Sequence, residues 1–165
     1  MKSRDTQFGF TLVEMLVYIA LLGLILTVLI NITLSFSKSY EQIGALRAAD
    51  QSALTAMERM IRDIHSAAAI DTGLSVFGTS PGVLVLTNDT ITTRFYVVDG
   101  EVRVDVGGAY LGPLSLSSAE VTNLVFTHLT TEETQAIKIE MTVEGRKGGV
   151  VKTKTYRTTA TLKES

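Results

Sequence analysis

The chain has 165 residues, with 15 basic and 17 acidic side chains, a net charge of −2 and no cysteine. This length accommodates one ordinary domain, or a smaller domain joined to a membrane segment. The absence of cysteine excludes disulfides, thiolate zinc sites and a cysteine nucleophile, and the lack of a dense basic cluster argues against nucleic-acid binding.

A long apolar run begins close to the N-terminus. Residues 10–32 contain one charged side chain, that of Glu14. As a helix the run is about 34 Å long, enough for a hydrocarbon core of about 30 Å. The sequence therefore predicts one membrane-spanning helix over residues 10–32.

The residues before this run set its orientation. Lys2 and Arg4 outnumber Asp5 in the leader, so the positive-inside rule predicts a cytoplasmic N-terminus and an outer domain over residues 33–165. An ordinary secretory signal is the alternative, but its apolar region is shorter and ends in a small-residue cleavage site, which does not follow here. We expect a single-pass protein of the inner membrane.

The junction between leader and apolar run reads G-F-T-L-V-E, residues 9–14. Gly9 resists helix continuation and fits a narrow protease cleft, whereas the residues from Phe10 onward favour a helix. This segment resembles the N-terminal signature of type IV prepilins and of type II secretion pseudopilins. The resemblance implies that a membrane prepilin peptidase removes residues 1–9 by cutting between Gly9 and Phe10, and that the new amine of Phe10 is methylated.

Glu14 needs an explanation because a bare charge in lipid is costly. A freed α-amine is mostly protonated at neutral pH, and Glu14 lies one helical turn beyond Phe10. A neighbouring helix displaced by about one turn brings its own Phe10 amine level with Glu14, so the two charges compensate each other between subunits. The alternative is that Glu14 reaches back to the lipid headgroups.

Beyond the membrane run, residues 38–70 contain no proline and favour a helix. Apolar side chains recur at helical spacing and predict one apolar face of this helix. These are Ile43, Leu46, Ala53, Met57, Ile61, Ile64 and Ala68. A single helix is expected from about Phe10 to Ala69, ended by the cluster Asp71-Thr72-Gly73.

From residue 74 onward the apolar period becomes alternating. A short strand around Leu84 precedes two strands joined by Asp99-Gly100, a dipeptide typical of a type I′ turn. Three later segments also alternate, and in one of them Ile137, Ile139, Met141 and Val143 share a face. The predicted fold is α+β and pilin-like: a long N-terminal helix whose second half covers one antiparallel sheet of about five or six strands.

A second resemblance is narrower. R-x-x-R-D-I-H-S-A at residues 59–67, G-P-L at 112–114 and V-T-N-L-V-F at 121–126 look like tip-associated minor pilins of the PilW/GspJ type. Two features depart from major pilins: there is no cysteine pair, and Asn31 stands where their apolar helix carries a proline. The first departure favours a minor subunit.

Few other residues of the sequence are candidates for catalysis, modification or metal binding. His65 and His128 are far apart in sequence and favour structural roles over catalysis or metal binding. Asn88-Asp89-Thr90 matches a glycosylation sequon but favours a turn. Asp71, Asp99 and Asp105 do not form a calcium-binding loop. We therefore expect no enzyme activity, no cofactor and no metal.

The predicted function is that of a structural minor pilin or pseudopilin at or near the tip of a filament, where it helps to prime assembly. Its expected partners are the prepilin peptidase, other pilins or pseudopilins, and the inner-membrane assembly platform. The alternative is a membrane-anchored binding or adhesin domain that never polymerises. The sequence does not choose among a secretion pseudopilus, a type IV pilus and a competence pilus.

Overall fold

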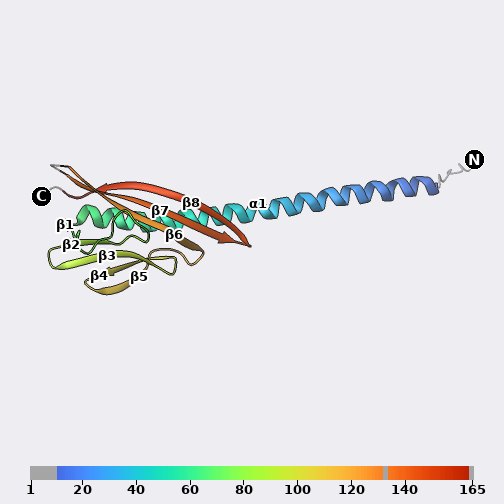
Figure 1. Cartoon of the computed structure of the whole chain (residues 1–165). Coiled ribbons are helices and arrows are strands. Elements are labelled where there is room, and N and C mark those ends of the chain that lie inside the picture. The colour runs from blue at the N-terminus through green and yellow to red at the C-terminus, as the bar shows by residue number, and fades with distance from the viewer. Residues whose placement is uncertain (1–10, 132–133, 164–165) are drawn as a thin grey trace, which may run out of the picture. The chain divides into compact units, whose positions relative to one another are not determined.

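The computed structural model describes residues 11–131 and 134–163. It contains one long helix, α1 (Leu12–Ser66), followed by eight strands (Figure 1). The chain divides into two compact units between Tyr40 and Glu41, so α1 contributes its first part to one unit and its second part to the other. Each unit is described by itself.

The helix ends where the chain enters a sheet. Ala68 donates its backbone N–H to the Thr87 carbonyl, and strand β1 follows at once. The Asp71 carboxylate then accepts the backbone N–H groups of Gly73 and Leu74, each at 3.0 Å. The predicted stop signal therefore forms the turn after β1, and the helix ends before it.

The strands form two antiparallel sheets. The five-stranded sheet has the order β1-β2-β3-β4-β5 and the three-stranded sheet the order β6-β7-β8. Their bounds are β1 (Ala69–Ile70), β2 (Leu84–Asn88), β3 (Ile91–Val98), β4 (Glu101–Val106), β5 (Ala109–Pro113), β6 (Ala119–Thr130), β7 (Gln135–Lys147) and β8 (Val150–Thr161). The predicted α+β class, with a long helix on antiparallel strands, is confirmed.

Turn chemistry was predicted well. Asp99 and Gly100 join β3 to β4 and have φ values of 54° and 75°, the left-handed conformations that a type I′ turn requires. Asp89 has a φ of 52° in the turn between β2 and β3, as the turn interpretation of Asn88-Asp89-Thr90 predicts.

The prediction of one sheet was wrong, and strand β5 is the reason. β5 pairs with the outer edge of β4, and the Leu114 N–H continues this pairing by donating to the Val102 carbonyl at 2.7 Å. The next strand, β6, pairs with β7 instead of β4 and begins a second sheet. The sequence of β5, A-Y-L-G-P, hides a strand because glycine and proline are rare inside strands.

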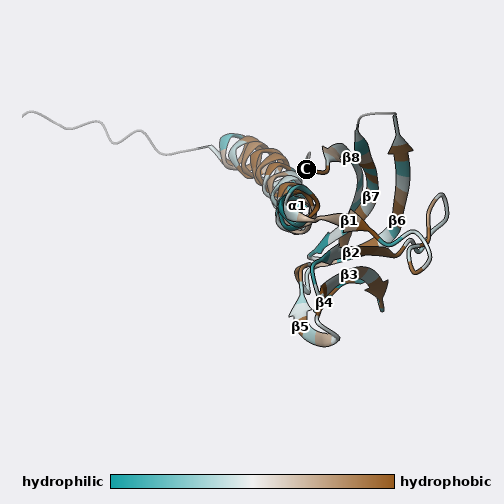
Figure 2. Cartoon of the chain, turned by 90° about the vertical axis from the view of Figure 1, so that its left-hand side faces the viewer, coloured by the Kyte–Doolittle hydropathy of each residue, from teal (hydrophilic) through white to brown (hydrophobic). Residues whose placement is uncertain are grey.

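One core lies between the second part of α1 and both sheets (Figure 2). The four residues predicted to share a face of β7 are all fully buried in it: Ile137, Ile139, Met141 and Val143. The predicted helix face was partly wrong, because Ile43 is 50% exposed, Leu46 is 37% exposed and Ala68 also lies at the surface. The helix buries mainly small side chains and methionines instead: Ala45, Ala49, Ser52, Ala53, Ala56, Met57, Met60 and Ile64.

The small helix residues allow β7 to approach the backbone of α1. A Cβ atom added to Gly145 would overlap the carbonyl oxygen of Ala45 and lie 2.9 Å from the Ala49 nitrogen. Gly145 and the neighbouring alanines therefore fix the closest contact between helix and sheet. The larger side chains of Ile43 and Leu46 lie at the surface instead.

Candidate processing and assembly site

The predicted site lies at the start of α1. Gly9 and Phe10 fall outside the described residues, so cleavage between them and methylation of Phe10 stay predictions. Thr11 precedes the helix, and its hydroxyl accepts the backbone N–H of Glu14 at 3.3 Å. This bond is an N-cap, and it places the Glu14 carboxylate in the first turn, where the helix dipole favours a negative charge.

Glu14 also has a partner on its own helix that the sequence reasoning missed. The Tyr18 hydroxyl donates to Glu14 Oε1 at 3.2 Å. The signals for these contacts were the T-x-x-E spacing of a capping box and a tyrosine one turn beyond the acid. A carboxylate accepts several hydrogen bonds, so Glu14 keeps the capacity to pair with an ammonium group while it holds Tyr18.

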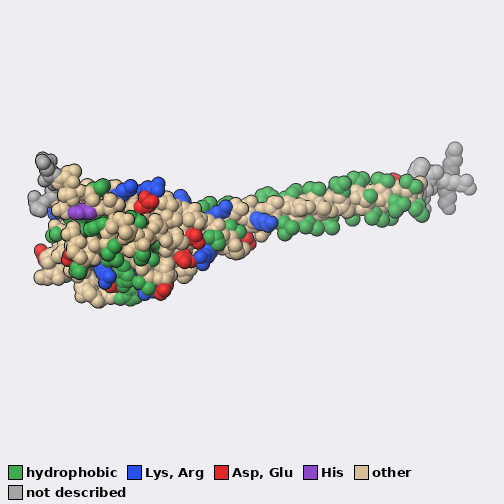
Figure 3. Space-filling view, viewed as in Figure 1, with side chains coloured by type: hydrophobic (Ala, Val, Ile, Leu, Met, Phe, Trp, Pro, Cys, Tyr) green, Lys and Arg blue, Asp and Glu red, His purple; other side chains and the backbone are tan. Residues whose placement is uncertain are grey.

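The surface around this site is apolar. From Leu12 to Leu34 the large hydrophobic side chains of α1 are about half exposed or more, and hydrophobic side chains cover this part of the helix in Figure 3. The part of the chain that the structure describes contains one helix long and apolar enough to cross a membrane. Such a surface requires lipid or other apolar helices around it.

The uncharged polar side chains of this segment bind within the helix. The Thr27 hydroxyl donates to the Gly23 carbonyl, and the Thr33 hydroxyl to the Leu29 carbonyl, each at 2.9 Å. The Asn31 amide donates to the Thr27 carbonyl at 2.8 Å. Bonds of this kind to the preceding turn reduce the cost of placing polar groups in lipid.

In the second compact unit, residues 41–165, a polar cluster joins α1 to β8. Asp50 accepts hydrogen bonds from Lys154 at 2.7 Å and from the Tyr156 hydroxyl at 2.5 Å. The bond from Lys154 is the main cause that lowers the pKa of Asp50, and the bond from Tyr156 lowers this pKa further. Burial, followed by the bond to Asp50, raises the pKa of Tyr156. The cluster therefore favours a charged aspartate beside a neutral tyrosine.

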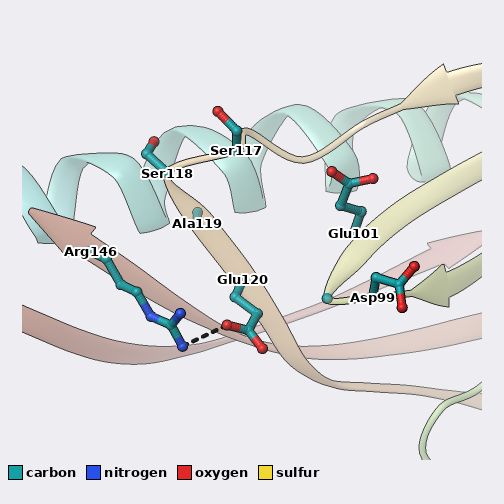
Figure 4. A pocket seen from close by; sticks show the side chains of 8 residues that line it. Asp99, Glu101, Ser117, Ser118, Ala119, Glu120 and Arg146 are labelled. Atoms are coloured by element: carbon teal, nitrogen blue, oxygen red, sulfur yellow. Dashed lines mark ion pairs between the residues drawn. The ribbon is translucent and has the colours of Figure 1, made fainter.

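A hollow of about 190 Å³ opens beside the turn between β3 and β4 (Figure 4). Two of its charged side chains pair with each other, since Arg146 on β7 lies 2.6 Å from Glu120 on β6. Arg146 also pairs with Glu144 at 3.5 Å and Glu101 with Arg103 at 3.3 Å, each of these pairs within one strand. We assign these ion pairs a structural role.

His128, Asp105 and Asp71 have structural partners, whereas His65 lies exposed at the end of α1. His128 stacks on Phe77 with ring centroids 5.5 Å apart, and Asp105 accepts the Tyr96 hydroxyl at 3.0 Å. Asp71 closes the turn described above. Among the described residues, no group of three or more His, Asp or Glu side chains is placed to hold a metal.

Comparison with known families decides the nature of the N-terminal segment. Residues 4–30 match the family described as the prokaryotic N-terminal methylation motif. The chain carries a type IV prepilin-like motif. The match spans Gly9, Phe10 and Glu14, and the predicted signature is thereby confirmed. No curated protein and no solved structure matches the chain.

The motif and the structure together give a coarse functional class. Proteins with this motif are structural subunits of the pilin and pseudopilin kind rather than enzymes, and the motif implies processing by a prepilin peptidase and assembly with other pilins. The long apolar helix fits a membrane-anchored, pilin-like protein.

Proposed function

We propose that this chain is a minor pilin or pseudopilin that is cleaved between Gly9 and Phe10, methylated on Phe10 and incorporated at or near the tip of a filament. The observation that carries the proposal is the methylation motif at residues 4–30, which leads into a helix that continues without interruption into an α+β domain. In the proposed assembly this domain stays outside the cytoplasm after single-pass insertion in the inner membrane, and primes assembly with other subunits.

Two features support a minor subunit. The chain contains no cysteine to staple a C-terminal loop. The run of residues 59–67 resembles tip-associated subunits of the PilW/GspJ type. A head-to-tail interface between such helices does not close on itself, which suits a growing filament.

Glu14 has the assembly role in this proposal. Once the leader is removed, the amine of Phe10 is a positive charge in an apolar bundle, and the Glu14 carboxylate of a neighbouring subunit compensates it. The Thr11 cap fixes the start of the helix, and the Tyr18 hydroxyl holds the carboxylate in place until the neighbouring amine arrives.

Mass spectrometry of the protein from membranes and from sheared filaments tests the proposal. We expect a chain that lacks residues 1–9 and carries one methyl group on Phe10, in both fractions. An intact leader, or a cut near residue 30, would overturn the processing step. A correctly processed chain that stays in the membrane fraction while filaments form normally would instead favour the membrane-anchored binding domain.

A further inference from the structure

Strand β8 is a long sheet edge without a partner strand. It is the last strand of the three-stranded sheet, runs for 12 residues and pairs with β7 without a register shift. It contains no proline and no glycine. Long, regular edges are the usual templates for strand addition, because each outward N–H and C=O group lacks a partner.

The outward backbone groups of β8 can be assigned from one hydrogen bond. Leu162 donates its N–H to the Gln135 carbonyl at 2.9 Å, so this pair belongs to the hydrogen-bonded set of the ladder. Residues of the other parity then direct their N–H and C=O groups away from β7. They are Val151, Thr153, Thr155, Arg157, Thr159 and Thr161, all of them exposed.

The other sheet edges are already protected. The loop before β2 covers β6, where Gly78 donates to the Phe126 carbonyl and Gly82 to the Leu124 carbonyl. β5 is short and ends in Pro113, and β1 has only two residues. Of the strands that the structure describes, β8 is the long edge that has neither a covering loop nor a proline, and its protection is limited to its basic side chains, those of Lys152, Lys154 and Arg157.

Charge selects the partner strand. Within β8 the charged residues are Lys152, Lys154 and Arg157, all basic. Lys154 and Arg157 pair with Asp50 and Glu140, but Lys152 has no ion pair among the described residues, and neither does the nearby Lys163. A second copy of β8 would bring basic residues together, which is unfavourable.

We propose that β8 is a docking edge for an extended segment of another protein chain that carries acidic side chains near both ends and β-branched or hydroxyl side chains between them. The backbone of that segment forms the ladder with β8, its central side chains lie beside the threonines, and its carboxylates meet Lys152 and Lys163. This proposal does not depend on leader cleavage, so it stands or fails separately from the proposed function.

Peptide binding to the full-length protein in detergent micelles tests this docking edge. The probe is a labelled peptide as long as β8 (12 residues), with glutamate at both ends and alternating valine and threonine between them. Three comparison peptides carry lysine in place of glutamate, methyl groups on alternate backbone nitrogens, or the sequence of residues 150–161. We expect the acidic peptide to bind at least roughly fivefold more tightly than each of the three.

Protein variants locate the binding. Thr159→Pro removes an outward N–H that β7 does not use, and we expect it to weaken binding of the acidic peptide roughly fivefold, whereas the matched Thr159→Val should change it less than about twofold. Lys152→Glu should also weaken binding. The methylated peptide keeps the test valid if the proline variant fails to fold. Failure of the acidic peptide to bind, equal binding of the lysine peptide, or equal binding of the 150–161 peptide would overturn the proposal.

Discussion

Asp50 shows how a single residue can connect helix and sheet. It lies on α1, yet both of its hydrogen-bond donors belong to β8, at positions 154 and 156. Nothing in the helical pattern distinguishes Asp50 from an ordinary solvated acid, because its partners follow more than 100 residues later. This long-range cluster could not be predicted from the sequence for that reason.

We predict that Asp50→Asn destabilises the second unit by about 1 kcal/mol at pH 7, since the charge-assisted bonds from Lys154 and Tyr156 are weakened. The folded-state pKa of Asp50 is lowered, so its contribution is fully present above the unfolded pKa of about 3.9 and is lost as the pH falls through the folded value. The difference in unfolding free energy between wild type and variant should therefore become smaller in acid. Urea unfolding followed by near-ultraviolet circular dichroism at pH 7 and pH 3 measures it.

Asp89→Asn is the matched control, because Asp89 lies in an exposed turn with a positive φ that asparagine adopts readily. Its unfolding free energy should equal that of the wild type within about 0.5 kcal/mol at both pH values. If Asp50→Asn lowers the unfolding free energy equally at pH 3 and pH 7, the assignment of the charged aspartate as the stabilising form is contradicted.

At the scale of elements, the helix, the turns and the strands that depend on neighbouring residues were predicted from the sequence pattern. The Asp99-Gly100 turn, the alternation in β7 and the continuous helix follow from dihedral preferences and periodicity. The separation into two sheets did not follow, because it depends on the atypical strand β5 taking the edge of β4. The buried helix face was misplaced since its close contact with β7 selects alanine over larger apolar side chains.

We predict that Gly145→Ala destabilises the second unit by about 2 kcal/mol, because the new methyl group meets the helix backbone at Ala45, which cannot move aside as a side chain can. Denaturant unfolding of both proteins measures the change. Gly73→Ala is the control: its added Cβ would make only an ordinary contact, 3.4 Å from the Asp71 carboxylate. If Gly145→Ala and Gly73→Ala have equal unfolding free energies, the helix and β7 can move apart without loss of stability, which contradicts the prediction.

At the scale of the whole molecule, the two ends of α1 serve different purposes. Its first part, with Glu14 as its single acid, is exposed and apolar, whereas its second part is built into the core of the second unit. The sequence revealed the first part readily, because the prepilin-like motif is local and has a strict spacing. The Tyr18 bond to Glu14 was not predicted, although the spacing of four residues places both side chains on one face of the helix.

We predict that Glu14→Leu leaves membrane insertion and leader cleavage intact but lowers incorporation into filaments at least roughly tenfold, because the released amine of a neighbouring subunit stays buried without a counter-charge. Tyr18→Phe, which keeps the ring and loses the donor, should cause a smaller loss. The measurement is the ratio of processed chain in sheared filaments to processed chain in membranes. Glu41→Leu, a charge removal outside the apolar segment, controls for general effects of lost charge. Normal incorporation of processed Glu14→Leu would show that the amine finds its counter-charge elsewhere, and Glu14 would then be explained by contact with the headgroups.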